Sequence, residues 1–170
     1  NMRARLRKAG IEVTGYDPNP AVTDVASLAE LAAALPAPRI VWVMVPSGKI
    51  TDDVIHDVSD VLEPGDLVID GGNSRFTDDA IHAEFLAGKQ LGFIDVGVSG
   101  GIWGLENGYG LMAGGDAADV KRAMPIFDGL ELAQMIRQPE GVGNPYAPII
   151  MLTGHSEKRR VMVARDAGVT

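Results

Sequence analysis

The feature that most constrains the fold of this chain is the alternation of short apolar, β-branched runs with longer stretches of helical character. Such alternation is the pattern of parallel strands joined by crossover helices. The run Ile40–Val45 is apolar throughout, as expected for a strand in a sheet that is covered on both faces. The sequence therefore predicts an α/β fold with three layers, α/β/α, around a doubly wound and mostly parallel sheet.

The expected elements follow one another closely. We predict strands over 11–16, 40–45, 66–70, 92–96 and 108–113, and helices ending at residue 10 and over 27–35, 50–62, 78–87 and 117–126. Ser27, with Glu30 three residues later, has the spacing of a capping box, and Thr51 or Ser47 is the expected cap of the helix at 50–62. Because the first residues already lie in a helical pattern without a cap, we expect further chain before Asn1.

Composition narrows the possible partners. The 170 residues contain no cysteine, which excludes disulfides and thiolate metal sites and suits a reducing cytoplasm, the expected location. The net charge of −8 disfavours nucleic acid, and the apolar runs are shorter than the ~20 residues of a membrane span. We expect no nucleic-acid or membrane partner and identify no metal site, and we interpret His56 and His82 as histidines of the surface or the core rim.

The most informative residues lie in two glycine-containing turns that follow expected strands. One is Asp70-Gly71-Gly72-Asn73-Ser74 and the other is Ser99-Gly100-Gly101. In the second turn, glycine lets backbone amides approach a ligand closely, and amides together with the serine hydroxyl bind oxyanions or hydroxyl-rich molecules. The alternative is that both segments are only tight turns.

These two motifs, with the run from Phe93 to Gly115 around the second, resemble the signature of 6-phosphogluconate dehydrogenase, a decarboxylating, nicotinamide-dependent family of the pentose phosphate pathway. The resemblance covers about residues 1–127 and implies a Rossmann-like domain. It assigns sugar-acid binding to Asn73, Ser99, Gly100 and Gly101, and cofactor binding to Asp17, Val45, Pro46 and Asn73.

Asp17 determines which cofactor we expect. It stands at the end of the expected strand 11–16, where an acidic side chain accepts hydrogen bonds from both ribose hydroxyls and repels a 2′-phosphate. No Arg or Lys occurs in this turn, which favours NAD over NADP. The alternative is that Asp17-Pro18-Asn19-Pro20 is only a turn closed by an Asx hydrogen bond.

The resemblance also implies parts that the sequence does not contain. The family's first strand and its G-x-G-x-x-G turn would precede Asn1, and the family's catalytic Lys and Glu lie in a K-M-V-H-N-G-I-E-Y helix that does not occur here. The family's reaction is hydride transfer from C3 of the sugar acid to the nicotinamide, then decarboxylation of the 3-keto acid and protonation of the enediol. We therefore assign no catalytic residue and expect residual binding of cofactor and sugar-acid phosphate, with cofactor affinity reduced or lost.

From about Met124 the sequence is similar to a second family. Met124-Pro125, then Asp128-Gly129-Leu130 and Pro148–Thr153, resemble a response-regulator receiver domain, a flavodoxin-like fold, over about 124–170. Its phosphoacceptor Asp would stand at Lys121, which disfavours a phosphorelay role. We expect residues 128–170 to complete the sheet, with strand 148–153 beside 11–16 or 40–45. A non-catalytic chimera is the second functional hypothesis, and a homodimer formed by strand pairing or swapping is the alternative way to cover the sheet edge.

Overall fold

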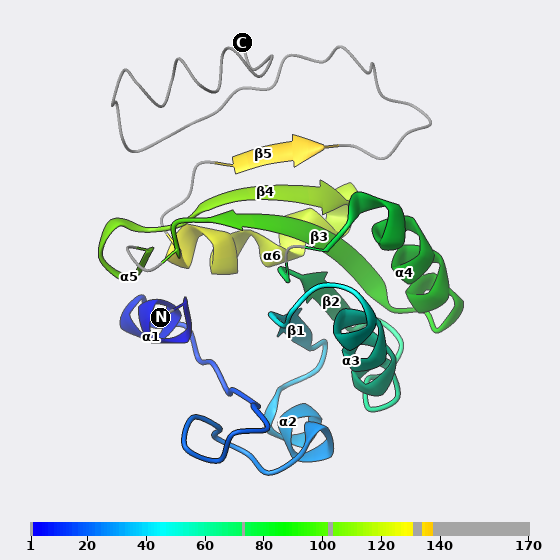
Figure 1. Cartoon of the computed structure of the whole chain (residues 1–170), viewed down its shortest axis with the longest axis horizontal. Helices are drawn as coiled ribbons and strands as arrows, with labels where there is room; N and C mark the ends of the chain where they lie inside the picture. The colour runs from blue at the N-terminus through cyan, green and yellow to red at the C-terminus, as the bar shows by residue number, and fades with distance from the viewer. Residues whose placement is uncertain (1, 73, 102–103, 131–133, 138–170) are drawn as a thin grey trace.

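A computed structural model describes residues 2–72, 74–101, 104–130 and 134–137 of the chain and confirms the α/β architecture (Figure 1). The strands are β1 (Ile40–Val43), β2 (Leu67–Asp70), β3 (Gly92–Ser99), β4 (Gly110–Gly115) and β5 (Gln134–Arg137). The helices are α1 (Met2–Lys8), α2 (Leu28–Ala34), α3 (Lys49–Ser59), α4 (Phe76–Gly88), α5 (Gly104–Asn107) and α6 (Ala117–Gly129). The strands form one sheet in the order β1-β2-β3-β4-β5, in which only the β3–β4 pair is antiparallel.

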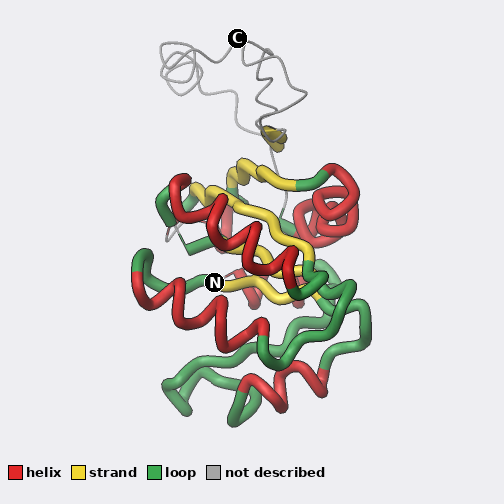
Figure 2. Tube along the Cα trace, turned by 90° about the vertical axis from the view of Figure 1, so that its right-hand side faces the viewer, coloured by secondary structure: helices red, strands yellow, loops and turns green. Residues whose placement is uncertain are grey.

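Helices cover both faces of the sheet. On one face, α1 and α6 pack against alternate residues of β2 and β3 through a cluster that includes Leu6 and Phe127. On the other face, α3 and α4 pack against β1 and β2 through Ile55 and Leu86, and Figure 2 shows this side of the molecule with helices in front of the strands. This arrangement confirms the predicted three layers.

Strand β2 lies at the centre of both clusters. Leu67 and Ile69 belong to the cluster under α6, whereas Val68 belongs to the cluster under α3 and α4, and all three are fully buried. Burial of an aliphatic side chain of this size contributes roughly 1.5–3 kcal/mol. These three residues alternate between the two faces, and because neither face is exposed to solvent, all three are apolar.

The expected strand over 11–16 is not formed, which corrects the sequence prediction. Its backbone groups form hydrogen bonds with side chains instead. The Arg7 guanidinium donates to the Val13 carbonyl, and the Gly15 amide donates to the Asp24 carboxylate at 2.7 Å. An isolated segment without a neighbouring strand has no ladder partners for its N–H and C=O groups. Local side-chain hydrogen bonds therefore replace a ladder in this segment.

Helix starts and ends differ in part from expectation. Ser27 accepts a hydrogen bond from the Glu30 amide at 3.1 Å, which confirms it as the cap of α2. At α3, however, the cap is Gly48 with φ 89°, and the Thr51 hydroxyl donates to the Pro46 carbonyl instead. Neither Thr51 nor Ser47 caps this helix, because the chain enters it through a backbone conformation that favours glycine.

The C-terminal part of the described chain was only partly anticipated. Helix α6 continues through Pro125 to Gly129, three residues beyond the predicted end, and Phe127 packs edge-on against Trp42 with ring centroids 6.0 Å apart. Strand β5 was not predicted. The expected strand 148–153 lies outside the described residues. Among the described helices, none combines the length and the hydropathy of a membrane span.

A buried ion pair fixes the turn before β2. The Asp66 carboxylate, 1% exposed, accepts hydrogen bonds from the backbone amides of Arg39 and Glu63 and from the Arg39 guanidinium at 3.0 Å. Burial alone would raise the pKa of Asp66, but these hydrogen bonds and the guanidinium charge outweigh it and hold the pKa below the ordinary 3.8. Asp66 therefore stabilises the fold in its ionised form.

We predict that Asp66→Asn lowers the free energy of unfolding by about 1–3 kcal/mol near neutral pH, because buried donors lose a charged acceptor. A carboxyl whose pKa is depressed in the folded state contributes stability above its ordinary pKa, and this contribution is lost as the pH falls through the folded value. Urea unfolding measured from pH 7 downward should therefore show that the difference in free energy of unfolding between the original chain and Asp66→Asn shrinks below pH 3.8. Asp53→Asn, at an exposed ion pair with Lys49, is the matched control and should change stability by less than about 0.5 kcal/mol.

Candidate functional site

The carboxyl ends of three parallel strands meet at one edge of the sheet. In the strand register, Val43 at the end of β1 faces Asp70 at the end of β2, and Asp70 faces Asp95 in β3. In open α/β sheets, ligands bind outside this edge of the sheet. The loops that follow β1, β2 and β3 therefore form the candidate site.

A pocket of about 260 Å³ opens at this edge. It is lined by Met44 and Val45 after β1, by Gly71 and Gly72 after β2, and by Val98 near the end of β3. Of the residues expected to bind the cofactor, Val45 lies in the lining. Pro46 follows it outside the lining, with its carbonyl held by the Thr51 hydroxyl at 3.0 Å.

Gly71 and Gly72 allow the loops after β1 and β2 to approach each other. A Cβ on Gly72 would lie 2.7 Å from the Val45 carbonyl oxygen, and a Cβ on Gly71 would collide with the indole of Trp42. A side chain at Gly72 would force the two loops apart, and one at Gly71 would displace the Trp42 indole of β1. The sequence analysis inferred a close backbone approach only for the glycines of the second turn. The Gly71-Gly72 pair indicates the same kind of approach here, and it was not used.

Asp70 folds the loop after β2 back over the strand end. Its carboxylate is fully buried and accepts hydrogen bonds from the Gly72 amide at 2.8 Å and from the Ser74 hydroxyl at 2.6 Å. These bonds close a turn of the Asx type. Asn73, the expected contact to both ligands, follows Gly72 in the sequence and lies outside the described residues.

The second turn follows β3 directly. Ser99 is the last residue of that strand, is exposed, and follows Val98 of the pocket lining. Gly100 and Gly101 have φ values of 142° and 49°, in the region that L side chains rarely adopt. A Cβ on Gly100 would also lie 3.0 Å from the Tyr109 ring. Ser99, Gly100 and Gly101 thus follow a residue of the pocket lining directly, in a turn whose conformation favours glycine.

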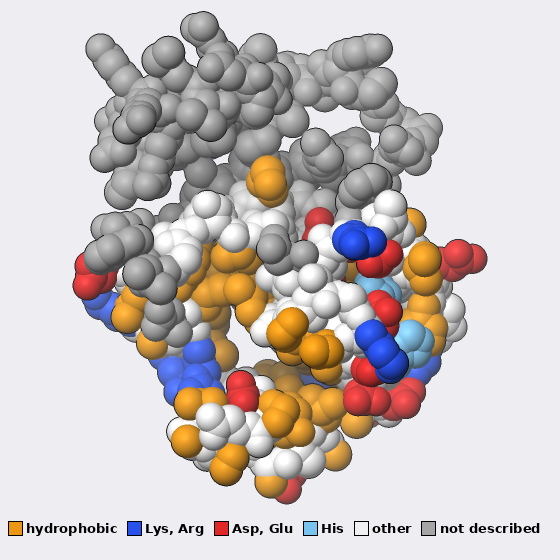
Figure 3. Space-filling model, in the orientation of Figure 1, with side chains coloured by type: hydrophobic (Ala, Val, Ile, Leu, Met, Phe, Trp, Pro, Cys, Tyr) orange, Lys and Arg blue, Asp and Glu red, His pale blue; other side chains and the backbone are white. Residues whose placement is uncertain are grey.

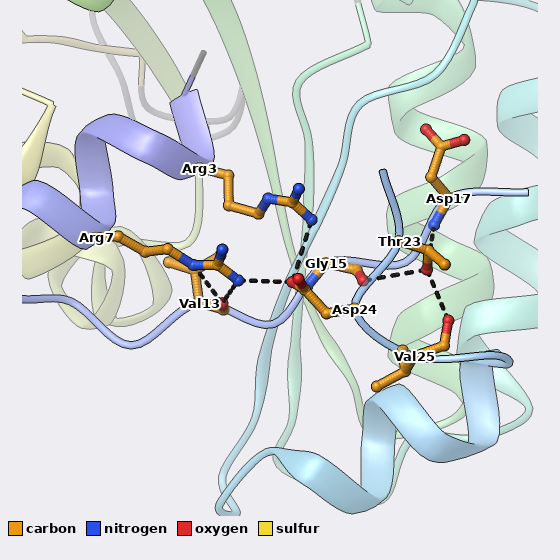
Figure 4. Close-up of polar contacts among 8 residues, drawn as sticks. All are labelled: Arg3, Arg7, Val13, Gly15, Asp17, Thr23, Asp24 and Val25. Atoms are coloured by element: carbon orange, nitrogen blue, oxygen red, sulfur yellow. Dashed lines mark hydrogen bonds and ion pairs between the residues drawn. The ribbon is translucent and has the colours of Figure 1, made fainter. Parts of the chain in front are cut away.

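Asp17 lies in the irregular segment that replaces the first expected strand. One of its carboxylate oxygens accepts a hydrogen bond from the Asn19 amide at 2.8 Å, which is the Asx turn of the alternative interpretation. In Figure 4 the carboxylate points away from Thr23 and Asp24. Asp17 does not line the pocket at the sheet edge.

Two arginines lie close to this segment and both are bound to Asp24 (Figure 4). Arg3 contacts the Asp24 carboxylate at 3.1 Å and Arg7 at 2.6 Å. The hydrogen bond from the Gly15 amide, together with these guanidinium groups, lowers the pKa of Asp24 below its ordinary value. Asp24 therefore stays ionised and partly neutralises both cations.

A cluster of titratable side chains lies behind the loop after β2. His82, interpreted from sequence as a surface or rim residue, is 3% exposed, and its Nε2 lies 2.8 Å from an Asp52 oxygen. Burial, together with the charges of Asp95 and Asp70, raises the pKa of Asp79 to about 6. Burial and Asp70 likewise raise the pKa of Asp95. Sequence reasoning missed this group because its members come from β2, β3, α3 and α4.

Comparison with known families gives one extended match. Residues 1–136 match the family described as the NAD binding domain of 6-phosphogluconate dehydrogenase, and the match continues past the boundary expected at residue 127. The decarboxylating 6-phosphogluconate dehydrogenase of Synechococcus elongatus is 45% identical over 100 residues, covering 59% of this chain and 21% of that protein. The NAD(+)-dependent enzyme of Bacillus subtilis is 38% identical over 59% of this chain and 21% of its own length. The chain thus spans about a fifth of the length of these relatives.

Solved structures share the fold. The Mycobacterium tuberculosis 3-hydroxyisobutyrate dehydrogenase, determined with L-serine, aligns with a TM-score of 0.70 at 26% identity over 79% of this chain and 50% of that one. The Plasmodium falciparum 6-phosphogluconate dehydrogenase, determined with NADP+ and with 6-phosphogluconate, aligns with a TM-score of 0.66 over 74% of this chain and 30% of that one. At 22% identity, this second likeness concerns the fold alone. Taken with the family match over residues 1–136, the sheet-edge pocket and its two glycine turns belong to a member of the 6-phosphogluconate dehydrogenase NAD-binding domain family.

Proposed function

We propose that this chain binds a nicotinamide dinucleotide and a phosphorylated sugar acid, as the cofactor domain of a decarboxylating 6-phosphogluconate dehydrogenase. The observation that supports this most directly is the pocket at the carboxyl ends of β1, β2 and β3, with the Ser99-Gly100-Gly101 turn beside it. Both expected ligand turns are thereby brought to one edge of the sheet. The relatives whose names carry this activity are the second support.

In this proposal, the residues of the pocket position the two ligands. NAD, when bound, accepts a hydride from the sugar acid. The apolar Val45 and the backbone of Gly72 border the nicotinamide, and the Ser99 hydroxyl with the following amides binds oxygen atoms of the sugar acid. Asn73 contacts both ligands. The printed sequence has no K-M-V-H-N-G-I-E-Y segment, so we assign binding and orientation, and no proton transfer, to these 170 residues.

The proposed cofactor is NAD rather than NADP. Asp17 offers a carboxylate to ribose hydroxyls and repels a 2′-phosphate. Arg3 and Arg7, the cations bonded to the same segment, are engaged by Asp24, which reduces their attraction for an additional phosphate. Cytoplasmic location belongs to the same proposal and rests on the absence of cysteine.

The alternative of a non-catalytic chimera with a receiver segment gains no support from the described residues. Met124 and Gly129, at the expected seam, belong to the continuous helix α6, which packs on the sheet through Phe127. A homodimer formed by strand pairing has one supporting observation. In the part of the sheet that the structure describes, β1 is an edge strand, and edge strands offer unpaired backbone groups.

We predict that NADH binds more tightly than NADPH. Asp17→Ala should reduce the ratio of the two affinities by about 10-fold, because a charge-assisted contact to the ribose is lost. Isothermal titration calorimetry with both nucleotides measures this. Glu12→Gln, in the same segment, removes an equal charge and should leave the preference unchanged. Absence of binding of either nucleotide at millimolar concentration would contradict the proposed function of the chain.

The turn after β3 gives a separate prediction for the sugar acid. We expect Ser99→Ala to weaken 6-phosphogluconate binding by roughly 2- to 10-fold, the effect of one lost hydrogen bond, and Ser99→Thr to restore most of the affinity because it keeps the hydroxyl. NADH affinity, measured on the same samples, should not change. Equal 6-phosphogluconate affinity in all three proteins would remove Ser99 from the site.

A further inference from the structure

Three side chains behind the pocket converge on one point. Asp70 at the end of β2 and Asp79 and His82 in α4 each present a ligand atom, and these atoms lie within 4.8 Å of one another. Asp79 and His82 are three residues apart in a helix and therefore lie on the same side of it. Figure 3 shows carboxylate and histidine atoms gathered on the side of the molecule that α3 and α4 form.

His82 has the orientation and tautomer of a metal ligand. Its side chain is 4% exposed, and the Nε2–H donates to the Asp52 carboxylate at 2.8 Å. A neutral imidazole that donates through Nε2 carries a lone pair on Nδ1. In the described structure that Nδ1 is buried and has no hydrogen-bond partner. Asp52 therefore fixes the ring through Nε2 and leaves Nδ1 without a partner among the described residues.

The two carboxylates offer matching oxygen atoms. The Asp79 Oδ1 is buried and has no partner among the described residues. The Asp70 oxygens are oriented by the Gly72 amide and the Ser74 hydroxyl and keep further lone pairs. None of the ion pairs in the described ranges includes Asp70 or Asp79, so their negative charges have no nearby protein cation.

We propose that Asp70, Asp79 and His82 bind a divalent transition-metal ion such as Zn²⁺. Two carboxylate oxygens and one imidazole nitrogen are a donor set suited to this class of ion, with remaining positions filled by water. Asp52 is the outer partner that orients the histidine, and Gly72 and Ser74 orient Asp70. The imidazole favours Zn²⁺ over Mg²⁺, which prefers oxygen ligands alone. Such an ion would clamp α4 to the end of β2.

The proposed ion would also stabilise the pocket, whichever ligand the pocket binds. Asp70 holds the turn that contains Gly72, and Gly72 lines the pocket. Through Asp52 the ion also connects to α3, which starts just after the loop containing Val45. The ion therefore stabilises two of the three loops at the sheet edge, whether or not they bind a nucleotide.

The test uses the full chain, without an affinity tag and treated with a chelator. Zn²⁺ is titrated calorimetrically, and Co²⁺ is followed by its visible absorption, which reports ligand number and symmetry. We expect one ion per chain, a higher melting temperature with Zn²⁺ than with the chelator, and no comparable effect of Mg²⁺. His82→Gln and Asp79→Asn should each weaken Zn²⁺ binding at least 10-fold, and Asp52→Asn should weaken it by about 10- to 100-fold.

Matched controls separate this site from surface binding. His56→Gln and His155→Gln remove the other histidines, and Asp78→Asn removes the carboxylate next to Asp79; all three should keep the affinity of the original chain. Circular dichroism in the presence of the chelator verifies that each variant is folded. Zn²⁺ affinity that is unchanged in folded His82→Gln and Asp79→Asn, or absence of binding up to millimolar Zn²⁺, would overturn the proposal. Neither result bears on the nucleotide titrations, which are performed with the chelator present.

Discussion

The structure depends on the complete burial of β2. This strand is short, yet its fully buried residues belong to the clusters on both faces of the sheet, and it ends in the candidate site. Leu67, Val68 and Ile69 fix its register against β1 and β3 by packing. Asp70, the next residue, is held at the sheet edge by that register. A one-residue slip would exchange the two faces and remove the carboxylate from its loop.

The parts of the fold that the sequence predicted well are those whose signal is local. A continuous apolar run such as 40–45 reports burial on both faces, and Ser27 with Glu30 reports a helix start, because the responsible contacts lie within a few residues. The run at 11–16 carries the same strand-like composition, but its outcome depends on a pairing partner elsewhere in the chain. Composition cannot report whether a neighbour is present, so the strand was predicted and an irregular segment held by Arg7 and Asp24 is found.

In the candidate site, too, local sequence motifs could be recognised, whereas contacts between distant segments could not. Val45, Gly100 and Gly101 were selected from motifs, and the two glycines carry the positive φ that such a motif indicates. The close approach of Gly72 to the Val45 carbonyl and the burial of His82 against Asp52 were not found, because each joins segments that lie more than 25 residues apart. A single histidine on a helix contains no information about which carboxylate will face it.

The antiparallel direction of β4 has an effect beyond the site itself. Strand β3 runs toward the pocket and β4 runs away from it, so β5, which is parallel to β4, also runs away from it and ends with Arg137 opposite Gly114. The first residue of β5 thus lies toward the pocket end of the strands, and its last residue lies toward the opposite end. For a protein engineer, position 137 is therefore an attachment point: a fluorophore or a surface tether joined there starts from the end of the sheet opposite the pocket.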